Sequence, residues 1–196
     1  MPRIVLLTLQ VLLFATATPA LADTAIFAGG CFWCMEADFE KLPGVSAVVS
    51  GFTGGTLPNP TYNGNHEGHV EAVQVTYDPR KVSYRQLLDY YWRHIDPFDG
   101  GGQFCDRGPS YRSAIFVATA AERASAEESK RQVAARFPGR TVVTPILAAS
   151  SFYPVKGEEE YHQDYYKKNP VRYHYYRWNC GRDQRVRDIW GERAGH

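Results

Sequence analysis

Long apolar runs, net charge and cysteine are all scarce in this chain. After residue 22, no apolar stretch approaches the ~20 residues that a membrane-spanning helix needs. The 22 Lys and Arg nearly balance the 21 Asp and Glu, so the net charge of +1 gives no argument for binding nucleic acid or an anionic membrane. Internal repeats and long linkers are also missing. The 196 residues suffice for one domain with a sizeable core.

The N-terminus is the one place where apolar residues run together. Arg3 precedes an apolar stretch over residues 4–14, and Ala-Leu-Ala follows at residues 20–22. This order is typical of a cleavable export signal, whereas a membrane anchor or a buried N-terminal strand would be the alternatives. We therefore expect residues 1–22 to be a signal peptide and residues 23–196 to be a single domain, periplasmic or secreted and without membrane attachment after cleavage.

Cysteine occurs only four times, as Cys31, Cys34, Cys105 and Cys180. An even number in an exported protein usually indicates structural disulfides. A domain of this length does not need such cross-links, however, and the Cys-x-x-Cys spacing of the first two is typical of redox-active pairs. The cysteines thus indicate either a structural framework or thiol chemistry.

Residues 29–34, Gly-Gly-Cys-Phe-Trp-Cys, form the most informative motif. They follow a β-like run over residues 24–28 and precede a helix-like run over residues 35–41. A thiol in the first turn of a helix lies near unpaired backbone N–H groups that favour an anion. We therefore expect the pKa of Cys31, the candidate nucleophile, to fall below its usual ~8.5. Cys34 follows one helical turn later and could form a disulfide with it.

Apolar periodicity predicts the element order β-α-β-β-α-β-α-β, followed by a Tyr-rich tail. The expected strands are residues 24–28, 45–52, 69–77, 112–118 and 142–149, and the expected helices are residues 35–41, 83–95, 120–136 and 183–190. This order predicts an α+β fold with helices packed on a mixed or antiparallel sheet. Two loops, residues 51–64 and 96–110, exceed ordinary connections, so we expect them to be functional. Residues 153–178 have no clear assignment.

Glu71 is flanked by apolar residues on one of the expected strands. If its side chain faces inward, burial would raise its pKa and keep it protonated, so that it could donate a hydrogen bond to an oxygen. A solvent-facing carboxylate is the simpler interpretation of a strand glutamate. Zinc binding by Cys31 and Cys34 with His66 and His69 is a further alternative, although the spacing is not that of a common zinc site.

The tail interleaves aromatic and basic residues between residues 161 and 178. Such a surface could stack single-stranded bases. Export and the near-zero net charge oppose that interpretation, so we expect no nucleic-acid partner. Tyr62, Tyr111 and Asp106 are unremarkable when taken singly.

Several short motifs nevertheless occur in a fixed order along residues 25–179. They are Gly-Cys-Phe-Trp at 30–33, Pro-Thr-Tyr at 60–62, Gly-His-Val-Glu at 68–71, Asp-Arg-Gly at 106–108, Tyr-Arg-Ser at 111–113 and Tyr-His-Gln at 161–163. Together they resemble the motifs of the peptide methionine sulfoxide reductase A family. The order of several motifs is far more specific than any one of them.

The resemblance implies a ferredoxin-like two-layer α/β sandwich that reduces methionine-S-sulfoxide, free or in proteins, to methionine without a cofactor or metal. It implies that Cys31 attacks the sulfoxide sulfur and becomes a sulfenic acid. Glu71, assisted by Tyr62 and Tyr111, would supply a proton to the oxygen. The residues implied to contact the substrate, including its S-methyl group, are Phe32, Trp33 and Asp106.

The resemblance also implies that a second thiol resolves the sulfenic acid as a disulfide, which thioredoxin or a similar protein then reduces. Cys34 is the expected resolving thiol because it replaces the family's usual Gly, and Cys180 in the tail is its rival. Cys105 stands where the family usually has Asn. A general thiol–disulfide oxidoreductase using Cys31 and Cys34 is the alternative function. We expect a monomer in either case.

Overall fold

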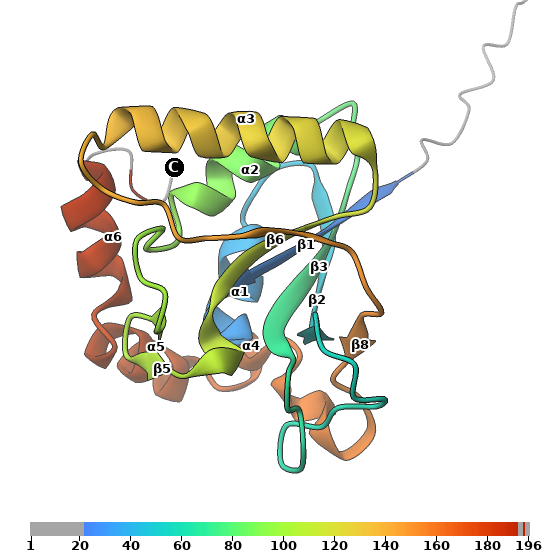
Figure 1. The fold of residues 1–196 in the computed structure, drawn as a ribbon. Coiled ribbons are helices and arrows are strands. Elements are labelled where there is room, and N and C mark those ends of the chain that lie inside the picture. Colours follow the sequence, from blue (N-terminus) through green and yellow to red (C-terminus); the bar gives the residue numbers. More distant parts are fainter. Residues whose placement is uncertain (1–21, 192–193, 195–196) are drawn as a thin grey trace, which may run out of the picture.

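The computed structural model describes residues 22–191 and Ala194. Apart from Ala22, the expected signal peptide lies outside the described residues. The described chain folds into a six-stranded sheet with helices packed around it (Figure 1), which is the expected α+β class. No described helix is long and apolar enough to cross a membrane.

The sheet has the strand order β7-β6-β1-β3-β2-β8. Its strands are β1 (Asp23–Gly29), β2 (Val45–Thr53), β3 (Val70–Tyr77), β6 (Ser113–Val117), β7 (Ile146–Ala148) and β8 (Tyr153–Pro154). All neighbours pair antiparallel except β6 and β7, which run parallel. The sheet is therefore mixed.

The last predicted strand, residues 142–149, is wrong over more than half its length, because only β7, residues 146–148, is a strand there. The Val143 N–H bonds instead to the carbonyl of Pro97, and Pro145 has no N–H to give to a ladder. This segment therefore runs against the 96–110 loop before it joins the sheet.

Six helices pack around the sheet within the described residues, and two of them begin at side-chain caps. They are α1 (Phe32–Phe39), α2 (Tyr84–Trp92), α3 (Ala120–Arg136), α4 (Tyr165–Lys168), α5 (Pro170–Asn179) and α6 (Arg182–Trp190), with 3-10 turns η1 (Pro109–Tyr111) and η2 (Gly157–His162). Ser83 and Thr119 each form a capping box with the residue three positions on, which fixes the starts of α2 and α3.

Aromatic packing holds β1 against two helices. The Phe27 ring of β1 stacks on Phe39 of α1 and on Tyr91 of α2, each at 5.1 Å between centroids. The buried Tyr91 hydroxyl donates to the Ala28 carbonyl at 2.8 Å, which satisfies its polar end. These contacts fix the end of β1, where the chain turns into α1.

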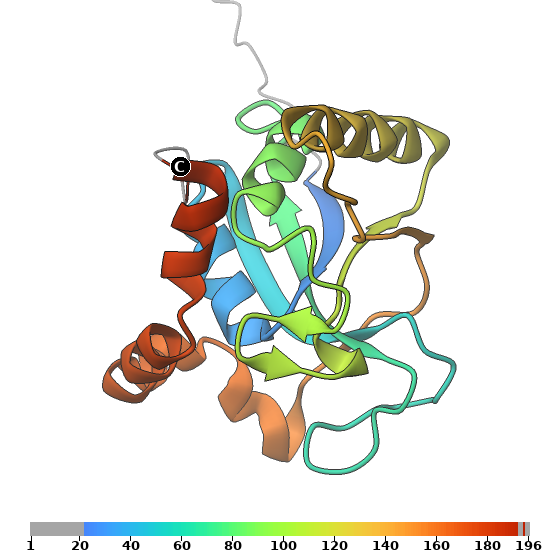
Figure 2. The same ribbon diagram turned by 60° about the vertical axis from the view of Figure 1, so that its left-hand side comes forward.

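The two long loops meet at one end of the molecule. Residues 96–110 contain a small ribbon of β4 (Gly102–Gln103) and β5 (Asp106–Arg107). Figure 2 shows this ribbon at the same end as the loop between β2 and β3 and the segment that leads into α4. Both loops that were expected to be functional therefore lie near the turn from β1 into α1.

Candidate active site

The turn between β1 and α1 positions Cys31. Gly30 has a φ of +83°, and a Cβ placed on it would lie 2.6 Å from the Cβ of Gln103, so only glycine fits. Cys31 is the N-cap of α1 and is 6% exposed. The predicted order of strand, glycine turn and helix is confirmed, with the helix starting at Phe32.

Cys31 lines a small cavity of about 70 Å³. The complete lining is Cys31, Phe32, Trp33, Tyr62, Glu71, Asp106, Tyr111 and Tyr176. Every residue that the sequence indicated as catalytic or substrate-binding is therefore in one place, contributed by α1, β3 and the two long loops. Tyr176 of α5 was missed, because the pattern of the tail gave no clear element.

Glu71 faces the interior, so the solvent-facing interpretation is wrong. It is 3% exposed, and its Oε2 accepts a hydrogen bond from the Phe32 N–H at 2.9 Å. Burial raises the pKa of this carboxyl to about 8, against the smaller lowering effect of that hydrogen bond. Glu71 is consequently protonated at neutral pH and can give a proton to an oxygen in the cavity.

The pKa values of the two thiols differ from the prediction. Burial raises the pKa of Cys31 well above its usual value, and interactions with Cys34 and Glu71 add to this. A hydrogen bond with Cys31 lowers the pKa of Cys34 to about 7. The expected low pKa of Cys31 is wrong because burial of the thiol disfavours its charged form.

Rings outside the cavity hold its aromatic wall in place. Trp33 stacks on Tyr165 at 3.8 Å between centroids, and its Nε1–H donates to His162 Nδ1 at 3.0 Å. His162 also packs on Tyr62 with ring centroids 3.9 Å apart, and Tyr62 lies 5.9 Å from Phe32. The apolar wall is thus preformed, and His162 has a supporting role that the sequence did not reveal.

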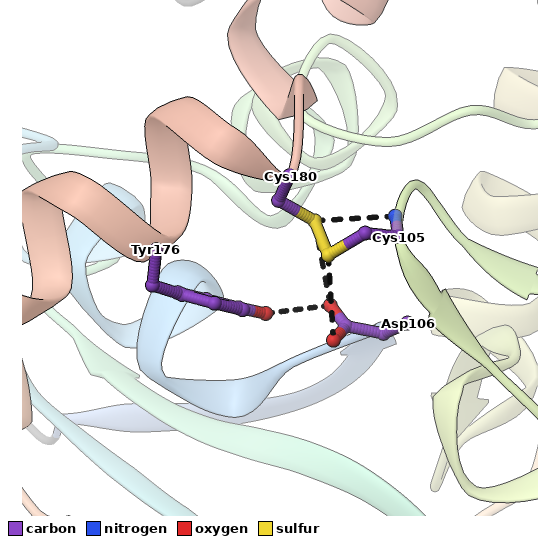
Figure 3. Close-up of a disulfide and its surroundings, with 4 residues drawn as sticks. All are labelled: Cys105, Asp106, Tyr176 and Cys180. Carbon is purple, nitrogen blue, oxygen red and sulfur yellow. Dashed lines mark hydrogen bonds between the residues drawn. A yellow bond between two sulfur atoms is a disulfide. The ribbon is translucent and has the colours of Figure 1, made fainter.

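The polar wall carries hydroxyl donors. Burial raises the pKa of Tyr62 and of Tyr111, so both hydroxyls remain protonated and can donate hydrogen bonds. Asp106 accepts a hydrogen bond from the Tyr176 hydroxyl at 2.6 Å (Figure 3), and burial raises the pKa of its carboxyl.

The remaining cysteines form a disulfide beside this wall. Cys105 and Cys180 are bonded across 75 residues of sequence and lie next to Asp106 (Figure 3). Cys105 is exposed, whereas the free thiols Cys31 and Cys34 are buried. The protein thus has an internal thiol pair and a disulfide that solvent reaches.

The two histidines of the zinc alternative instead make contacts at the end of β2 and in the loop that follows it. His69 is buried, with its Nε2 2.8 Å from the Leu57 carbonyl, and His66 stacks on Phe52. Within residues 22–191, neither histidine joins a group of metal-ligating atoms with the free thiols. The geometry therefore gives that alternative no support.

Comparison with known proteins decides between the remaining functions. A family model described as peptide methionine sulfoxide reductase matches residues 23–194. The chain belongs to this family. It is 52% identical over 195 residues to the peptide methionine sulfoxide reductase MsrA 2 of Caulobacter vibrioides, with 96% of this chain and 97% of the relative covered. It is 49% identical over 175 residues to the MsrA of Bacillus licheniformis, with 87% and 95% covered.

Solved structures agree with the family assignment. Mxr1 from Saccharomyces cerevisiae in reduced form matches with a TM-score of 0.70 and 28% identity over 79% of this chain and 89% of that one. Methionine sulfoxide reductase A of Corynebacterium diphtheriae matches with a TM-score of 0.66 and 34% identity over 79% and 77%. The expected fold and the expected activity, reduction of methionine sulfoxide, are both confirmed.

Proposed function

We propose that Cys31 is the nucleophile of this methionine sulfoxide reductase and that Glu71 is its acid. The observation that carries the proposal is that a thiol and a protonated carboxyl line the same cavity of about 70 Å³. Cys31 sulfur attacks the sulfoxide sulfur while Glu71 gives its proton to the oxygen. Methionine leaves, the oxygen stays on Cys31 as a sulfenic acid, and the proton released by the thiol replaces the one that Glu71 gave.

The cavity walls orient the substrate. The rings of Phe32 and Trp33 offer an apolar place for the S-methyl group, and Tyr62 and Tyr111 line the same cavity. Because the methyl side and the oxygen side of the cavity are chemically different, one epimer at sulfur fits, for which we propose the S epimer. Asp106 would hold the backbone of free or protein-bound substrate, or a water.

Recycling uses the other cysteines. Cys34 packs in one buried cluster with Cys31 and is placed to resolve the sulfenic acid, forming a disulfide with loss of water. Exchange with the thiols of Cys105 and Cys180 would then free the internal pair. The resulting state, with Cys31 and Cys34 reduced and Cys105–Cys180 bonded, is the one that the structure describes.

A dithiol protein of the thioredoxin class would reduce that disulfide. A protein thiol can approach exposed Cys105, but not Cys31 at 6% or Cys34 at 1% exposure. Mxr1 of Saccharomyces cerevisiae has been crystallised in complex with Trx2. The same burial opposes the general thiol–disulfide oxidoreductase, since a protein disulfide would have to enter the cavity to meet Cys31.

Export of a monomeric single domain, residues 23–196, completes the proposal. Strand β1 begins at Asp23, directly after the proposed cleavage site at Ala22, so removal of residues 1–22 would leave the described sheet intact. The substrates would then be oxidised proteins or free methionine sulfoxide in that compartment.

Replacement of the nucleophile tests the assignment. We expect Cys31→Ser to lower methionine formation from a sulfoxide-containing peptide by at least ~10³-fold, because the serine hydroxyl stays protonated and is a poor nucleophile. The matched control, Cys180→Ser, should still form methionine in a first turnover. Substantial turnover by the Cys31→Ser protein would remove Cys31 from the mechanism.

A further inference from the structure

Asp106 of β5 contacts the Cys105–Cys180 disulfide with both of its carboxyl oxygens. Its Oδ1 lies 3.8 Å from the Cys105 sulfur, and its Oδ2 lies 3.9 Å from the Cys180 sulfur (Figure 3). A sulfur in a disulfide carries no proton, so a hydrogen bond across either contact needs a proton on the carboxyl. The disulfide therefore lies beside a group that can donate to the sulfur released when the disulfide opens.

A tight turn holds the carboxyl in this place. Gln103 and Asp106 pair across the β4–β5 ribbon, and Phe104 between them adopts the left-handed region with a φ of +57°. The disulfide links the same turn to Cys180 at the end of α5. The backbone and the cross-link thus both fix the carboxyl relative to the two sulfurs.

Burial favours the protonated form of this carboxyl. Desolvation raises the pKa of Asp106, against two weaker effects that lower it, the hydrogen bond from the Tyr176 hydroxyl at 2.6 Å and the positive charge of Arg182. The same two groups stabilise the carboxylate that remains once the proton has left. Asp106 can therefore both give up a proton and take it back.

Other titratable and charged groups surround Asp106. They are Cys31 at the start of α1, Tyr62 in the loop after β2, Glu71 of β3, Tyr111 of η1, Tyr176 of α5 and Arg182 of α6. Burial raises the pKa of the thiol, of Glu71 to about 8, and of the three tyrosines, so below about pH 8 they keep their protons. The charge of these neighbours is therefore constant in that range.

The two sulfurs differ in what surrounds them. Cys105 is exposed, so we expect a reductant to attack its sulfur, and the Cys180 sulfur is then the one that leaves. The Cys180 sulfur accepts a hydrogen bond from the Cys105 N–H at 3.1 Å (Figure 3), and this donor stabilises negative charge that develops there. The leaving sulfur thus has both an N–H group and a carboxyl beside it.

We propose that Asp106 is a catalytic residue of recycling, which gives its proton to the Cys180 sulfur when a reductant opens the disulfide. The inference rests on the proposed role of this disulfide in recycling. A thiolate of the reductant bonds to the Cys105 sulfur, the Cys105–Cys180 bond breaks, and its electron pair passes to the Cys180 sulfur. The Asp106 proton moves to that sulfur, and the carboxylate left behind keeps the hydrogen bond from Tyr176.

The second half of the exchange restores the starting groups. The second thiol of the reductant loses its proton to solvent and attacks the mixed disulfide, so that the Cys105 sulfur leaves with the electron pair. Cys105 and Asp106 then each take a proton from solvent. The reductant departs as an internal disulfide, and Cys105 and Cys180 are both reduced.

Reduction of the preformed disulfide by dithiothreitol, with no sulfoxide present, tests this role between pH 5 and 8. Acid quenching, alkylation and mass spectrometry follow Cys105 and Cys180 separately from the internal thiols, and each rate is divided by the concentration of dithiothreitol thiolate. In the parent protein we expect this corrected rate to fall as the pH rises through the pKa of Asp106. Asp106→Asn should lower it by at least ~10-fold at pH 5 and remove its pH dependence.

A carboxylate that acted only by its charge would give the opposite result. It would repel the reductant thiolate, so its removal would speed the reaction. A corrected rate in Asp106→Asn that equals or exceeds the parent rate at every pH would therefore overturn the proposal. The matched control is Asp99→Asn, which removes a carboxylate of the same loop that pairs with Arg107, and it should keep the parent profile within ~2-fold.

Tyr176→Phe tests whether Asp106 is the group that titrates. It removes the hydrogen bond that lowers the pKa of Asp106, so the fall in the corrected rate should move to higher pH by at least ~0.5 unit. A profile that does not move would overturn the assignment to Asp106. This variant also decides the question if Asp106→Asn does not fold or does not form the disulfide.

The two proposals fail in different ways. Undiminished steady-state turnover with a thioredoxin system in both Cys105→Ser and Cys180→Ser would remove the disulfide from recycling. Loss of turnover in those variants, together with parent-like reduction of the disulfide in Asp106→Asn, would defeat only the proton transfer from Asp106.

Discussion

Burial sets the protonation of the residues that line the active-site cavity. Glu71 stays protonated because its ionised form would be desolvated, and Cys31 remains a thiol for the same reason. Tyr62 and Tyr111 keep their protons as well. The cavity therefore presents neutral donors to a neutral sulfoxide.

The same burial predicts a cost in stability at Glu71. Its pKa is raised from 4.5 to about 8 in the folded protein, so above pH 4.5 the unfolded chain releases a proton that the folded one keeps. Stability is therefore lost as pH rises from 4.5 to 8, by up to about 5 kcal/mol at 1.36 kcal/mol per pKa unit. Glu71→Gln removes this loss and can still accept the Phe32 N–H.

Urea unfolding at pH 5 and at pH 8 measures the effect. The stabilisation of Glu71→Gln relative to the parent should be at least ~1 kcal/mol larger at pH 8. Exposed Glu67→Gln is the matched control, with no such pH dependence expected. If the Glu71→Gln difference is equal at both pH values, the carboxyl is not held protonated.

The sequence motifs identified most of the residues that line the cavity, but they did not predict the pKa values of those residues. Cys31, Glu71 and the aromatic residues were found because their motifs are local. The pKa of Cys31 could not be predicted, because it depends on burial of the thiol in a cluster that includes Tyr173 of the tail. Arg182 of α6 is 1% exposed, and its charged sequence neighbourhood likewise gives no signal of this burial.

At the scale of elements, a buried ion pair fastens α5 to α1. Arg177 of α5 contacts Asp38 of α1 at 2.9 Å, and their side chains are 14% and 2% exposed. The contact holds α5, and with it Tyr176, over the cavity that opens at the start of α1. The tail thereby becomes part of the active site.

Breaking this pair should cost much more than breaking a surface pair. Removing Asp38 takes away one of the two carboxylates that Arg177 contacts and leaves Asp183 at 2.6 Å, so we expect Asp38→Ala to lower the free energy of unfolding by about 1.5–3 kcal/mol. Asp89→Ala, which breaks the exposed Arg85–Asp89 pair of α2, should cost no more than ~0.5 kcal/mol. Denaturant titration of both variants gives the comparison, and equal losses would refute the fastening role.

Elements with local stop and start signals were predictable, and those without were not. Helix α3 spans 120–136 as expected, because Thr119 and Glu122 form its capping box. The tail resisted prediction because α4 has only four residues and α5 starts at Pro170 without a side-chain cap. Such short elements depend on contacts with the rest of the fold, which no local pattern encodes.

Across the whole molecule, the chemistry is divided between an internal thiol pair and an external disulfide. Cys31 and Cys34 are sheltered under the tail, whereas Cys105–Cys180 links the long 96–110 loop to the end of α5 beside Asp106. Substrate can therefore react at the buried thiol pair, while a reductant can react at the neighbouring disulfide. The sequence predicted the sheet, yet not this disulfide, because the folding of the tail decides which thiols meet.

Cys180→Ser should separate the two halves of the cycle. It removes the disulfide but none of the cavity lining, so the first equivalent of methionine should form at a rate within ~3-fold of the parent. Steady-state turnover with a thioredoxin system should fall by at least ~10²-fold, because the reductant loses its accessible disulfide. Cys105→Ser should give the same result, and undiminished steady-state turnover in both would exclude this disulfide from recycling.

Trapping the sulfenic acid tests the central claim most directly. In the Cys34→Ser, Cys180→Ser double variant, one equivalent of a methionine sulfoxide peptide is added with dimedone, and the labelled residue is mapped by mass spectrometry. The account predicts one label on Cys31 for each methionine formed. Full methionine formation with the label on Cys105, or with Cys31 unmodified, would contradict it.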